Sequence, residues 1–299
     1  MILVSGGAGV MGSRLVKGLV KAENNVRVLT LPGDPHVSRL ENVDCEMVFA
    51  DVTDAKTLEG VFRDVRTVYH LAAVIIANNQ ETFRRINVGG TRNMIQGAAS
   101  SNVNHFIYVS SASVIFPNAS AYARSKMEGE RIVKSQKKMH YTIVRPTLVY
   151  ERDGGQEFLM FMESLKRYPF VPFVGRGRAK KNPVFAEDVV KGLLAVAHNS
   201  RTYGKVYNLS GGEVVTIREL ARLMLKCLGL SRPIIPVPIW LCKAIALVLE
   251  KTMKNPPLTR YAISRIEQDA DLDNTEAQKD LGYNPLGVTE GLKRCYPVR

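Results

Sequence analysis

Residues Ile2 to Val20 read ILVSGGAGVMGSRLVKGLV, and this stretch decides the fold. Its apolar start predicts a buried strand, which breaks into a turn with glycines at positions 6, 7, 9 and 12. Apolar residues from Leu15 to Val20 then recur at helical spacing. Strand, glycine turn and helix in this order predict a backbone that approaches a pyrophosphate, with the N–H groups of the helix start facing the phosphates. The alternative is an ordinary strand-to-helix loop in a parallel sheet.

Strands and helices continue to alternate through the first half of the chain. The predicted strands are Val26–Thr30, Glu46–Ala50, Thr67–Leu71, His105–Val109 and Tyr141–Val144, with helices over Glu81–Ser100 and Tyr122–Val133. This alternation predicts an α/β fold with a doubly wound parallel sheet of the Rossmann type. The glycine turn at the head of such a series favours the dinucleotide interpretation over the ordinary loop.

The pattern changes after Tyr150, which predicts a second, smaller lobe. We expect a dinucleotide-binding domain over 1–150, with 184–210 returning to it through a strand at Val206–Leu209. The segments 151–183 and 211–299 would form a mostly helical substrate-binding lobe. Within it, Thr216 to Glu219 matches a capping box that opens a helix to about Leu228.

The composition narrows the class of protein. The net charge of +13 is spread along the chain without a nucleic-acid-binding motif, so we expect anionic small molecules as ligands and no nucleic acid. The four cysteines lack Cys-x-x-Cys spacing, which predicts no metal site and no disulfide and fits a reducing cytoplasm. The first strand starts at residue 2 and leaves no room for a signal peptide. The apolar run Ile239–Leu249 is too short to span a bilayer, so we expect no stable membrane insertion.

The ends of the predicted strands indicate where a cofactor would lie. The second strand ends in Thr30-Leu31, without the acid that binds the adenosine 2′-hydroxyl in strict NAD users. Arg14 could meet a 2′-phosphate or be a solvated helix side chain, so the choice between NAD and NADP stays open. Small residues after the fourth strand, Ala72 and Ala73, would let a cofactor cross the sheet edge.

Tyr122 and Lys126 are four residues apart on a predicted helix and therefore share a face. A cation beside a phenol lowers the phenol pKa, which suits a tyrosine to general acid or base catalysis near neutral pH. Ser111, at the end of the preceding strand, could hydrogen-bond the same reacting oxygen. Together the three residues predict proton transfer at an alcohol or ketone as hydride moves to or from a nicotinamide; a surface tyrosine–lysine pair is the alternative.

At this point the chain resembles the extended short-chain dehydrogenases/reductases, in their NAD-dependent epimerase/dehydratase branch. The residues that carry the resemblance span nearly the whole chain: Gly6-x-x-Gly9-x-x-Gly12, Asp51-Val52, His70-Leu71-Ala72-Ala73, Asn87 with Gly90-Thr91, Ser110-Ser111, Tyr122-x-x-x-Lys126, Arg145-Pro146, Glu187-Asp188 and Leu281-Gly282-Tyr283. The resemblance implies catalytic roles for Ser111, Tyr122 and Lys126 and a homodimeric assembly. The cofactor site it implies comprises Gly6, Gly9, Val10, Met11, Gly12, Arg14, Asp51, Val52, Leu71, Ala72, Ala73, Asn87, Tyr122 and Lys126.

Two features bear on the substrate. Ala112-Ser113 stands where the family's 4,6-dehydratases carry an Asp-Glu pair, so we expect no dehydratase, and Ser113 would contact substrate. Lys181 stands about where sugar-nucleotide enzymes of the family bind a diphosphate, and Arg176 is nearby. A solvated basic loop is the alternative.

We therefore expect a cytoplasmic NAD(P)-dependent oxidoreductase, with a nucleotide-sugar C4 epimerase as the leading hypothesis. The alternative is an NADPH-dependent ketone or aldehyde reductase or a hydroxysteroid-dehydrogenase-like enzyme, because 145–150 (RPTLVY) leans toward that branch. A non-catalytic NAD(P)-binding protein is a third possibility. For the apolar stretch Val237–Leu249 we expect a buried amphipathic helix or a dimer contact rather than a substrate cap or a membrane contact.

Overall fold

The computed structural model describes residues 1–77, 79–152, 155–253, 256 and 258–296. The chain forms two compact units, each built from separate segments of sequence. The first unit comprises Met1–Pro146, Ala186–Leu209 and Asn274–Asn284. The second comprises Thr147–Phe185, Ser210–Asp273 and Pro285–Arg299.

The first unit is a parallel sheet covered by helices on both faces, which confirms the predicted fold class. Within the described residues the sheet has seven strands in the order β11-β6-β5-β4-β1-β2-β3, all paired in parallel. The strands are β1 (Ile2–Ser5), β2 (Val26–Thr30), β3 (Glu46–Phe49), β4 (Thr67–His70), β5 (His105–Val109), β6 (His140–Pro146) and β11 (Lys205–Leu209). The strand order reverses between β1 and β4, and ligands of open α/β sheets bind at such a point.

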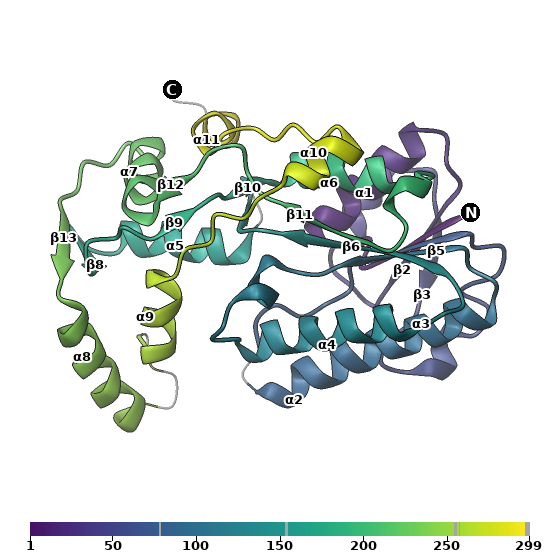
Figure 1. Ribbon diagram of the computed structural model, residues 1–299, viewed down its shortest axis with the longest axis horizontal. Helices are drawn as coiled ribbons and strands as arrows, with labels where there is room; N and C mark the ends of the chain where they lie inside the picture. The colour runs from purple at the N-terminus through teal and green to yellow at the C-terminus, as the bar shows by residue number, and fades with distance from the viewer. Residues whose placement is uncertain (78, 153–154, 254–255, 257, 297–299) are drawn as a thin grey trace. The chain divides into compact units, whose positions relative to one another are not determined.

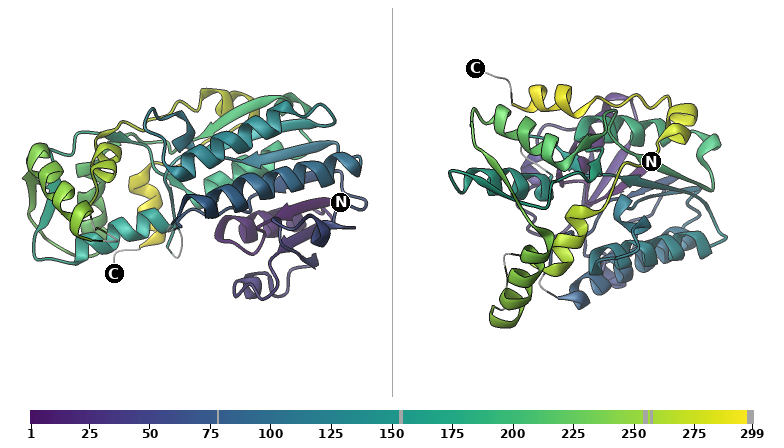
Figure 2. Two further views of the ribbon diagram at one scale, coloured as in Figure 1. Left: turned by 90° about the horizontal axis from the view of Figure 1, so that it is seen from below. Right: turned by 60° about the vertical axis from the view of Figure 1, so that its left-hand side comes forward.

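Helices cover the two faces of this sheet in separate groups (Figures 1 and 2). One face carries α1 (Val10–Lys21), α6 (Ala186–Val196) and α10 (Thr275–Leu281). The other carries α2 (Gln80–Phe83), a π-helical segment (Arg84–Gly89), α3 (Gly90–Ser100) and α4 (Ala121–Ser135). Strands β1, β2, β4 and β5 are buried along their whole length, because helices cover both sides. The strands and helices predicted in this half of the chain are all present to within a few residues.

The helix expected over Glu81–Ser100 is interrupted by the π-helical segment. Single π turns inside α-helices are frequent at functional sites. Here the segment carries Asn87, whose side chain bonds the backbone N–H and C=O of Val74 (2.8 and 3.0 Å). The widened turn therefore accompanies a side-chain contact between the helix and the loop after β4.

The second unit combines short two-stranded ladders with helices around its own core. Its strands pair as β7 (Val149–Tyr150) with β10 (Val184–Phe185), β8 (Val171–Val174) with β13 (Ile234–Val237), and β9 (Lys180–Lys181) with β12 (Val215–Thr216). Its helices are α5 (Gln156–Lys166), α7 (Ile217–Cys227), α8 (Ile239–Thr252), α9 (Arg260–Glu267) and α11 (Val288–Cys295). The capping box predicted at Thr216 is formed with Glu219 at the start of α7. Among the described residues, none of the helices has the length and apolar character needed to cross a membrane.

Two boundaries differ from the sequence-based division. Thr147–Tyr150 belongs to the second unit, because β7 pairs with β10 there. Asn274–Asn284 belongs to the first unit, although we assigned it to the smaller lobe. Asp280 on α10 accepts hydrogen bonds from Lys205 (2.5 Å) and Tyr207 (2.8 Å) of β11, which ties this segment to the sheet.

We expected Val237–Leu249 to be a buried amphipathic helix or a dimer contact, and the first of these two predictions is wrong. The stretch forms most of α8, but only Cys242 and Ala246 of that helix are buried. These two buried side chains are small, whereas most of the large apolar side chains of the helix are exposed, including Trp240 at 71%.

Candidate active site

The glycine loop between β1 and α1 makes the close backbone approach that the sequence predicts. Gly6 has a φ of +71°, and a Cβ there would lie 2.8 Å from the backbone N of Ala72. A Cβ on Gly12 would lie 2.2 Å from the carbonyl oxygen of Gly6. Gly9 is the N-cap of α1 and has no side chain with which to cap the first helical turn, at Val10 and Met11. The loop therefore fits a nicotinamide dinucleotide, whose pyrophosphate needs small residues and a helix N-terminus.

The loops after β3 and β4 complete this edge of the sheet. Leu71, Ala72 and Ala73 follow β4 and are half-buried. Asp51 follows β3, and its Oδ1 accepts a hydrogen bond from the N–H of Thr53 (2.8 Å). Val52 has a different environment, because its side chain packs in the core, where a Cβ on Gly90 would come within 2.8 Å of it.

Arg39 contacts the glycine loop, and the sequence reasoning missed this contact. It lies on the short 3-10 helix Val37–Leu40 after β2, and its Nη1 donates to the carbonyl oxygen of Ala8 in the glycine loop (3.2 Å). Arg14 is exposed on the first turns of α1. The strand end also carries an acid, because Asp34 accepts a hydrogen bond from Thr30 (2.7 Å). We infer that the guanidinium of Arg39, held against the glycine loop, would contact a 2′-phosphate.

Ser111 and Ser113 form a hydroxyl pair at the end of β5. Ser113 Oγ donates to Ser111 Oγ (2.9 Å), and Ser111 caps the 3-10 helix that follows. The preceding residue, Ser110, donates to Glu130 on α4 (2.7 Å). This bond ties the strand end that carries Ser111 to α4, which carries Tyr122.

Lys126 lies on α4 one turn after Tyr122 and is only 2% exposed. Its Nζ is 4.2 Å from the centre of the Tyr108 ring, a cation–π contact. Burial lowers the pKa of Lys126 to about 7, against which the Glu130 carboxylate acts to raise it. Gly129 permits this arrangement, since a Cβ there would lie 2.1 Å from the Tyr108 hydroxyl.

Glu130 continues the face of α4 that carries Tyr122 and Lys126. Its carboxylate accepts two hydrogen bonds from Arg145 of β6 (2.8 and 2.6 Å) and the one from Ser110. Burial alone would raise the pKa of Glu130, but these hydrogen bonds hold it below its ordinary value. The i, i+4, i+8 spacing of Tyr122, Lys126 and Glu130 was a sequence signal for this extended face.

A buried hydrogen-bonded chain links β1, β4 and the helix that carries Asn87. His70 contacts Ser5 through Nδ1 (2.7 Å) and Thr91 through Nε2 (3.0 Å). Because Thr91 Oγ1 donates to the carbonyl oxygen of Asn87 (2.6 Å), it accepts from Nε2–H of His70. Burial lowers the pKa of His70 to about 3, so the imidazole is neutral. Asn87 also donates to Ser125, beside Lys126 (2.9 Å).

The two cations expected at a diphosphate, Lys181 and Arg176, have different surroundings in the second unit. Lys181 Nζ donates to the carbonyl oxygens of Gln268 (2.5 Å) and Arg265 (3.3 Å), at the C-terminal end of α9. Lysines stabilise helix C-termini in this way. Arg176, by contrast, lines a pocket with a cavity volume of about 540 Å³.

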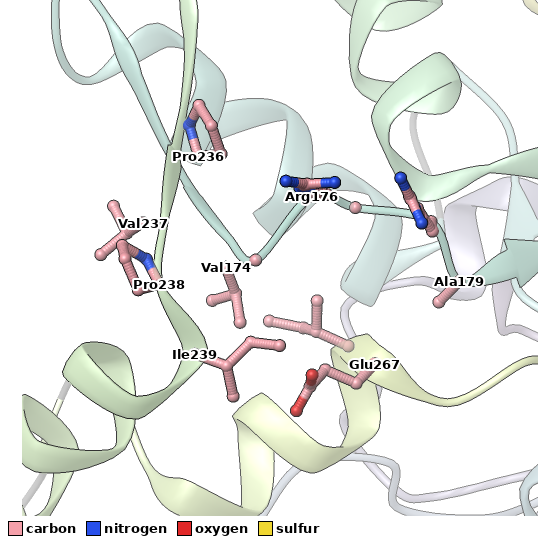
Figure 3. Close-up of a pocket in the computed structure, with 12 residues that line it drawn as sticks. Val174, Arg176, Ala179, Pro236, Val237, Pro238, Ile239 and Glu267 are labelled. Atoms are coloured by element: carbon pink, nitrogen blue, oxygen red, sulfur yellow. The ribbon is translucent and has the colours of Figure 1, made fainter.

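This pocket has mostly aliphatic walls (Figure 3). They come from the ends of β8 and β13, the start of α8 and the end of α9: Val174, Pro236, Val237, Pro238, Ile239 and Ile266. Arg176, Arg178 and Glu267 are the charged residues of its lining. In the described part of the chain, no group of three or more His, Cys, Asp or Glu residues could hold a metal ion.

Comparison with known proteins places the chain in a family. The model of the "NAD dependent epimerase/dehydratase family" matches residues 2–210, from the glycine loop to the end of β11. The chain belongs to this family. It is therefore an NAD(P)-dependent enzyme of the extended short-chain dehydrogenase/reductase type, as the resemblance implied.

Individual known proteins are similar to this chain over nearly its full length. The 3 beta-hydroxysteroid dehydrogenase/Delta 5-->4-isomerase of Mycobacterium tuberculosis is 26% identical, over 99% of this chain and 89% of its own. The 2-alkyl-3-oxoalkanoate reductase of Stenotrophomonas maltophilia is 23% identical, over 98% and 97%. The structure of the UDP-glucose 4-epimerase of Thermotoga maritima superposes with a TM-score of 0.77 at 22% identity, over 99% and 97%, and shares the fold.

Replacing Arg39 with alanine should weaken NADPH binding selectively. We expect an affinity for NADPH about tenfold lower, because a charge-assisted contact to the 2′-phosphate is lost, and an affinity for NADH within about twofold. Titration calorimetry with both nucleotides measures the two values. Arg63→Ala, an exposed arginine of the same unit, is the control. Equal losses for NADPH and NADH would contradict a phosphate role for Arg39.

Replacing Lys126 with methionine should stabilise the free protein in a pH-dependent way. The pKa of Lys126 is lowered on folding, so the penalty of burying its charge is complete below about pH 7 and diminishes as the pH rises toward 10.5. We expect a gain in the free energy of unfolding on the order of 2 kcal/mol at pH 6 and a much smaller gain at pH 9.5. Urea denaturation at both pH values measures it, with Lys137→Met, an exposed lysine just beyond the same helix, as control. A gain independent of pH would contradict the assignment.

Proposed function

We propose that this protein is an NAD(P)(H)-dependent dehydrogenase or reductase that acts at a secondary alcohol or ketone of a largely apolar substrate. The observation that carries this choice is the pocket of the second unit, with its aliphatic walls. This proposed function differs from the nucleotide-sugar C4 epimerase that we favoured on the sequence. The reasons for the change are features of the second unit.

The pocket suits an apolar group better than a sugar. A sugar presents hydroxyl groups that need several polar partners when they are buried. The walls contributed by Val174, Pro236–Ile239 and Ile266 have no side-chain donor or acceptor. A volume of about 540 Å³ is ample for a bulky hydrocarbon substituent. Burying that substituent would supply binding energy of about 25 cal/mol for each Å² of apolar surface.

The state of Lys181 also argues against the diphosphate. Its ammonium group is half-buried and donates to two carbonyl oxygens of α9. Turning it toward a phosphate would leave those carbonyls without their donor, at a cost of about 1–3 kcal/mol. The relatives in sequence point the same way, since the names of two of them specify a hydroxysteroid and a 2-alkyl-3-oxoalkanoate.

The residues of α4 and β5 would manage the proton. A nicotinamide cofactor bound at the glycine loop would itself donate or accept the hydride. In reduction, Tyr122 gives its phenolic proton to the ketone oxygen as that oxygen gains negative charge, while Ser111 donates a hydrogen bond to the same oxygen. Lys126, when charged, favours the phenolate that remains on Tyr122. In oxidation of an alcohol, the same phenolate takes the hydroxyl proton.

A nucleotide-sugar C4 epimerase is the second candidate. It is favoured by the two arginines of the pocket, Arg176 and Arg178, whose guanidinium groups match phosphate geometry. The solved UDP-glucose 4-epimerase shares the fold. In such an enzyme, Tyr122 would remove and return the same hydroxyl proton during one turnover.

Replacing Tyr122 with phenylalanine should abolish most of the activity. We expect kcat to fall by a factor of about 10²–10⁴, because the proton donor is lost, with cofactor affinity nearly unchanged. Oxidation of NADPH by a 2-alkyl-3-oxoalkanoate, or reduction of NAD by a 3-hydroxysteroid, measures the rate. Tyr168→Phe in the second unit is the control. Full activity of the Tyr122 variant on such a substrate would contradict the mechanism.

The cofactor content of the purified protein should separate the two candidates. A reductase or dehydrogenase exchanges its cofactor at every turnover, so we expect less than about one tenth of the protein to retain nucleotide through purification. Mass spectrometry of the supernatant after denaturation measures the retained amount. Near-stoichiometric NAD, together with conversion of UDP-glucose in the absence of added cofactor, would overturn the proposal in favour of the epimerase.

A further inference from the structure

Helix α8 presents an apolar face to solvent. At 100° per residue, Trp240, Leu241, Ala244, Ile245, Leu247 and Val248 share one side of the helix, and all six are exposed. Trp240 is 71% exposed and Val248 is 59% exposed. The described helix has no acidic residue on that side. Contiguous apolar faces of this kind mark interaction surfaces rather than ordinary protein surface.

The opposite side of α8 is already packed within the second unit. Cys242 and Ala246 are buried against Ile263 of α9, and Ile239 and Val237 flank this cluster. Figure 1 shows α8 lying beside α9 at the lower left. The two fully buried residues of α8 are small and most of its large apolar residues face outward, which reverses the usual arrangement of an amphipathic surface helix. The outward face is therefore available to an occupant outside the unit.

The charges on α8 favour an anionic occupant. Lys243 and Lys251 are exposed, and Glu250 is paired with Arg260 of α9 (2.8 Å). The whole chain carries a net charge of +13. Lys243 lies beside the apolar face, and Lys251 lies at its C-terminal end. An apolar face that begins with a tryptophan and carries lysines at its edge and end has the composition of helices that lie in the interface of an anionic membrane.

The size of α8 argues against two other roles, a membrane-spanning helix and the contact of a stable dimer. A helix of 14 residues is about 21 Å long, shorter than the hydrocarbon core of about 30 Å that a spanning helix must cross. One face of such a helix covers a few hundred Å², less than half of the roughly 800 Å² that each partner of a standard protein interface buries. By itself it is too small for a stable dimer of this chain.

We propose that α8 docks this protein reversibly on anionic phospholipid bilayers, with the face that contains Trp240 and Val248 in the lipid interface. Lys243 and Lys251 contact the headgroups. The anchor goes beyond the proposed function and does not depend on it, because it rests on α8 alone. It would place the enzyme where apolar molecules partition from water.

Trp240 is the single tryptophan of the chain, so its fluorescence reports on this face alone. Titration of the intact protein with vesicles of phosphatidylcholine and phosphatidylglycerol should shift the Trp240 emission to shorter wavelength. It should also protect the Trp240 fluorescence from quenching by iodide. Vesicles of phosphatidylcholine alone should give a much smaller shift, and high salt should reverse the binding. An emission unchanged by the anionic vesicles would overturn the proposal.

Variants distinguish vesicle binding through α8 from binding through the rest of the protein surface. Val248→Ser should weaken co-sedimentation with the anionic vesicles about fivefold or more, whereas Val214→Ser, a valine of similar exposure (53%), should not. Lys243→Gln with Lys251→Gln should weaken it about 25-fold, and Lys17→Gln with Lys21→Gln on α1 should have little effect. Retained NADPH binding shows that each variant is folded.

Three further outcomes would each overturn the lipid assignment. Equal effects of Val248→Ser and Val214→Ser would mean that α8 is not the contact. A blue shift that grows with protein concentration without vesicles would assign the face to a second copy of the chain. A blue shift on adding NADPH or substrate without vesicles would assign it to another part of the same chain.

Discussion

The close approach of two loops at the point where the strand order reverses is the constraint on which the cofactor site depends. β1 and β4 are neighbours in the sheet, and their C-terminal loops meet where Gly6 passes the backbone of Ala72. Any side chain at Gly6 would have to occupy the space of that backbone. The contact brings the helix start of α1 and the small residues after β4 to one edge, where a dinucleotide can lie across both.

Burial of charge is the second organising feature of the first unit. Lys126 is almost fully buried, and a buried ammonium is held at the expense of folding stability. Its neighbours limit that penalty: the Tyr108 ring lies below the nitrogen, and Glu130 lies one turn further along α4. Glu130 is itself held by Arg145 and Ser110. The charged groups of the site are thus connected in series, with Glu130 near Lys126 and Arg145 bonded to Glu130.

In the second unit, a residue that the sequence suggests is functional has a structural role instead. Lys181 stands where the family resemblance implies a diphosphate ligand, yet it caps the carbonyl end of α9. Arg176, five residues earlier, lines the pocket instead. The aliphatic walls beside it come from segments far apart in sequence, Pro236–Ile239 and Ile266. The character of the pocket therefore depends on contacts that local sequence does not encode.

The strands, the helices of the first half and the glycine loop could be predicted from the sequence, because hydrophobic periodicity and glycine spacing are local properties of the chain. The same holds for the Tyr122–Lys126 face and the capping box at Thr216. Only the tertiary structure decided that Asn274–Asn284 joins the first unit, that Arg39 reaches the glycine loop, and that His70 bridges Ser5 and Thr91. It also decided that the apolar side of α8 faces outward, since a composition rich in leucine and isoleucine predicts burial whichever way a helix is turned. Long-range packing sets these features, and no pattern within a single segment specifies its partner.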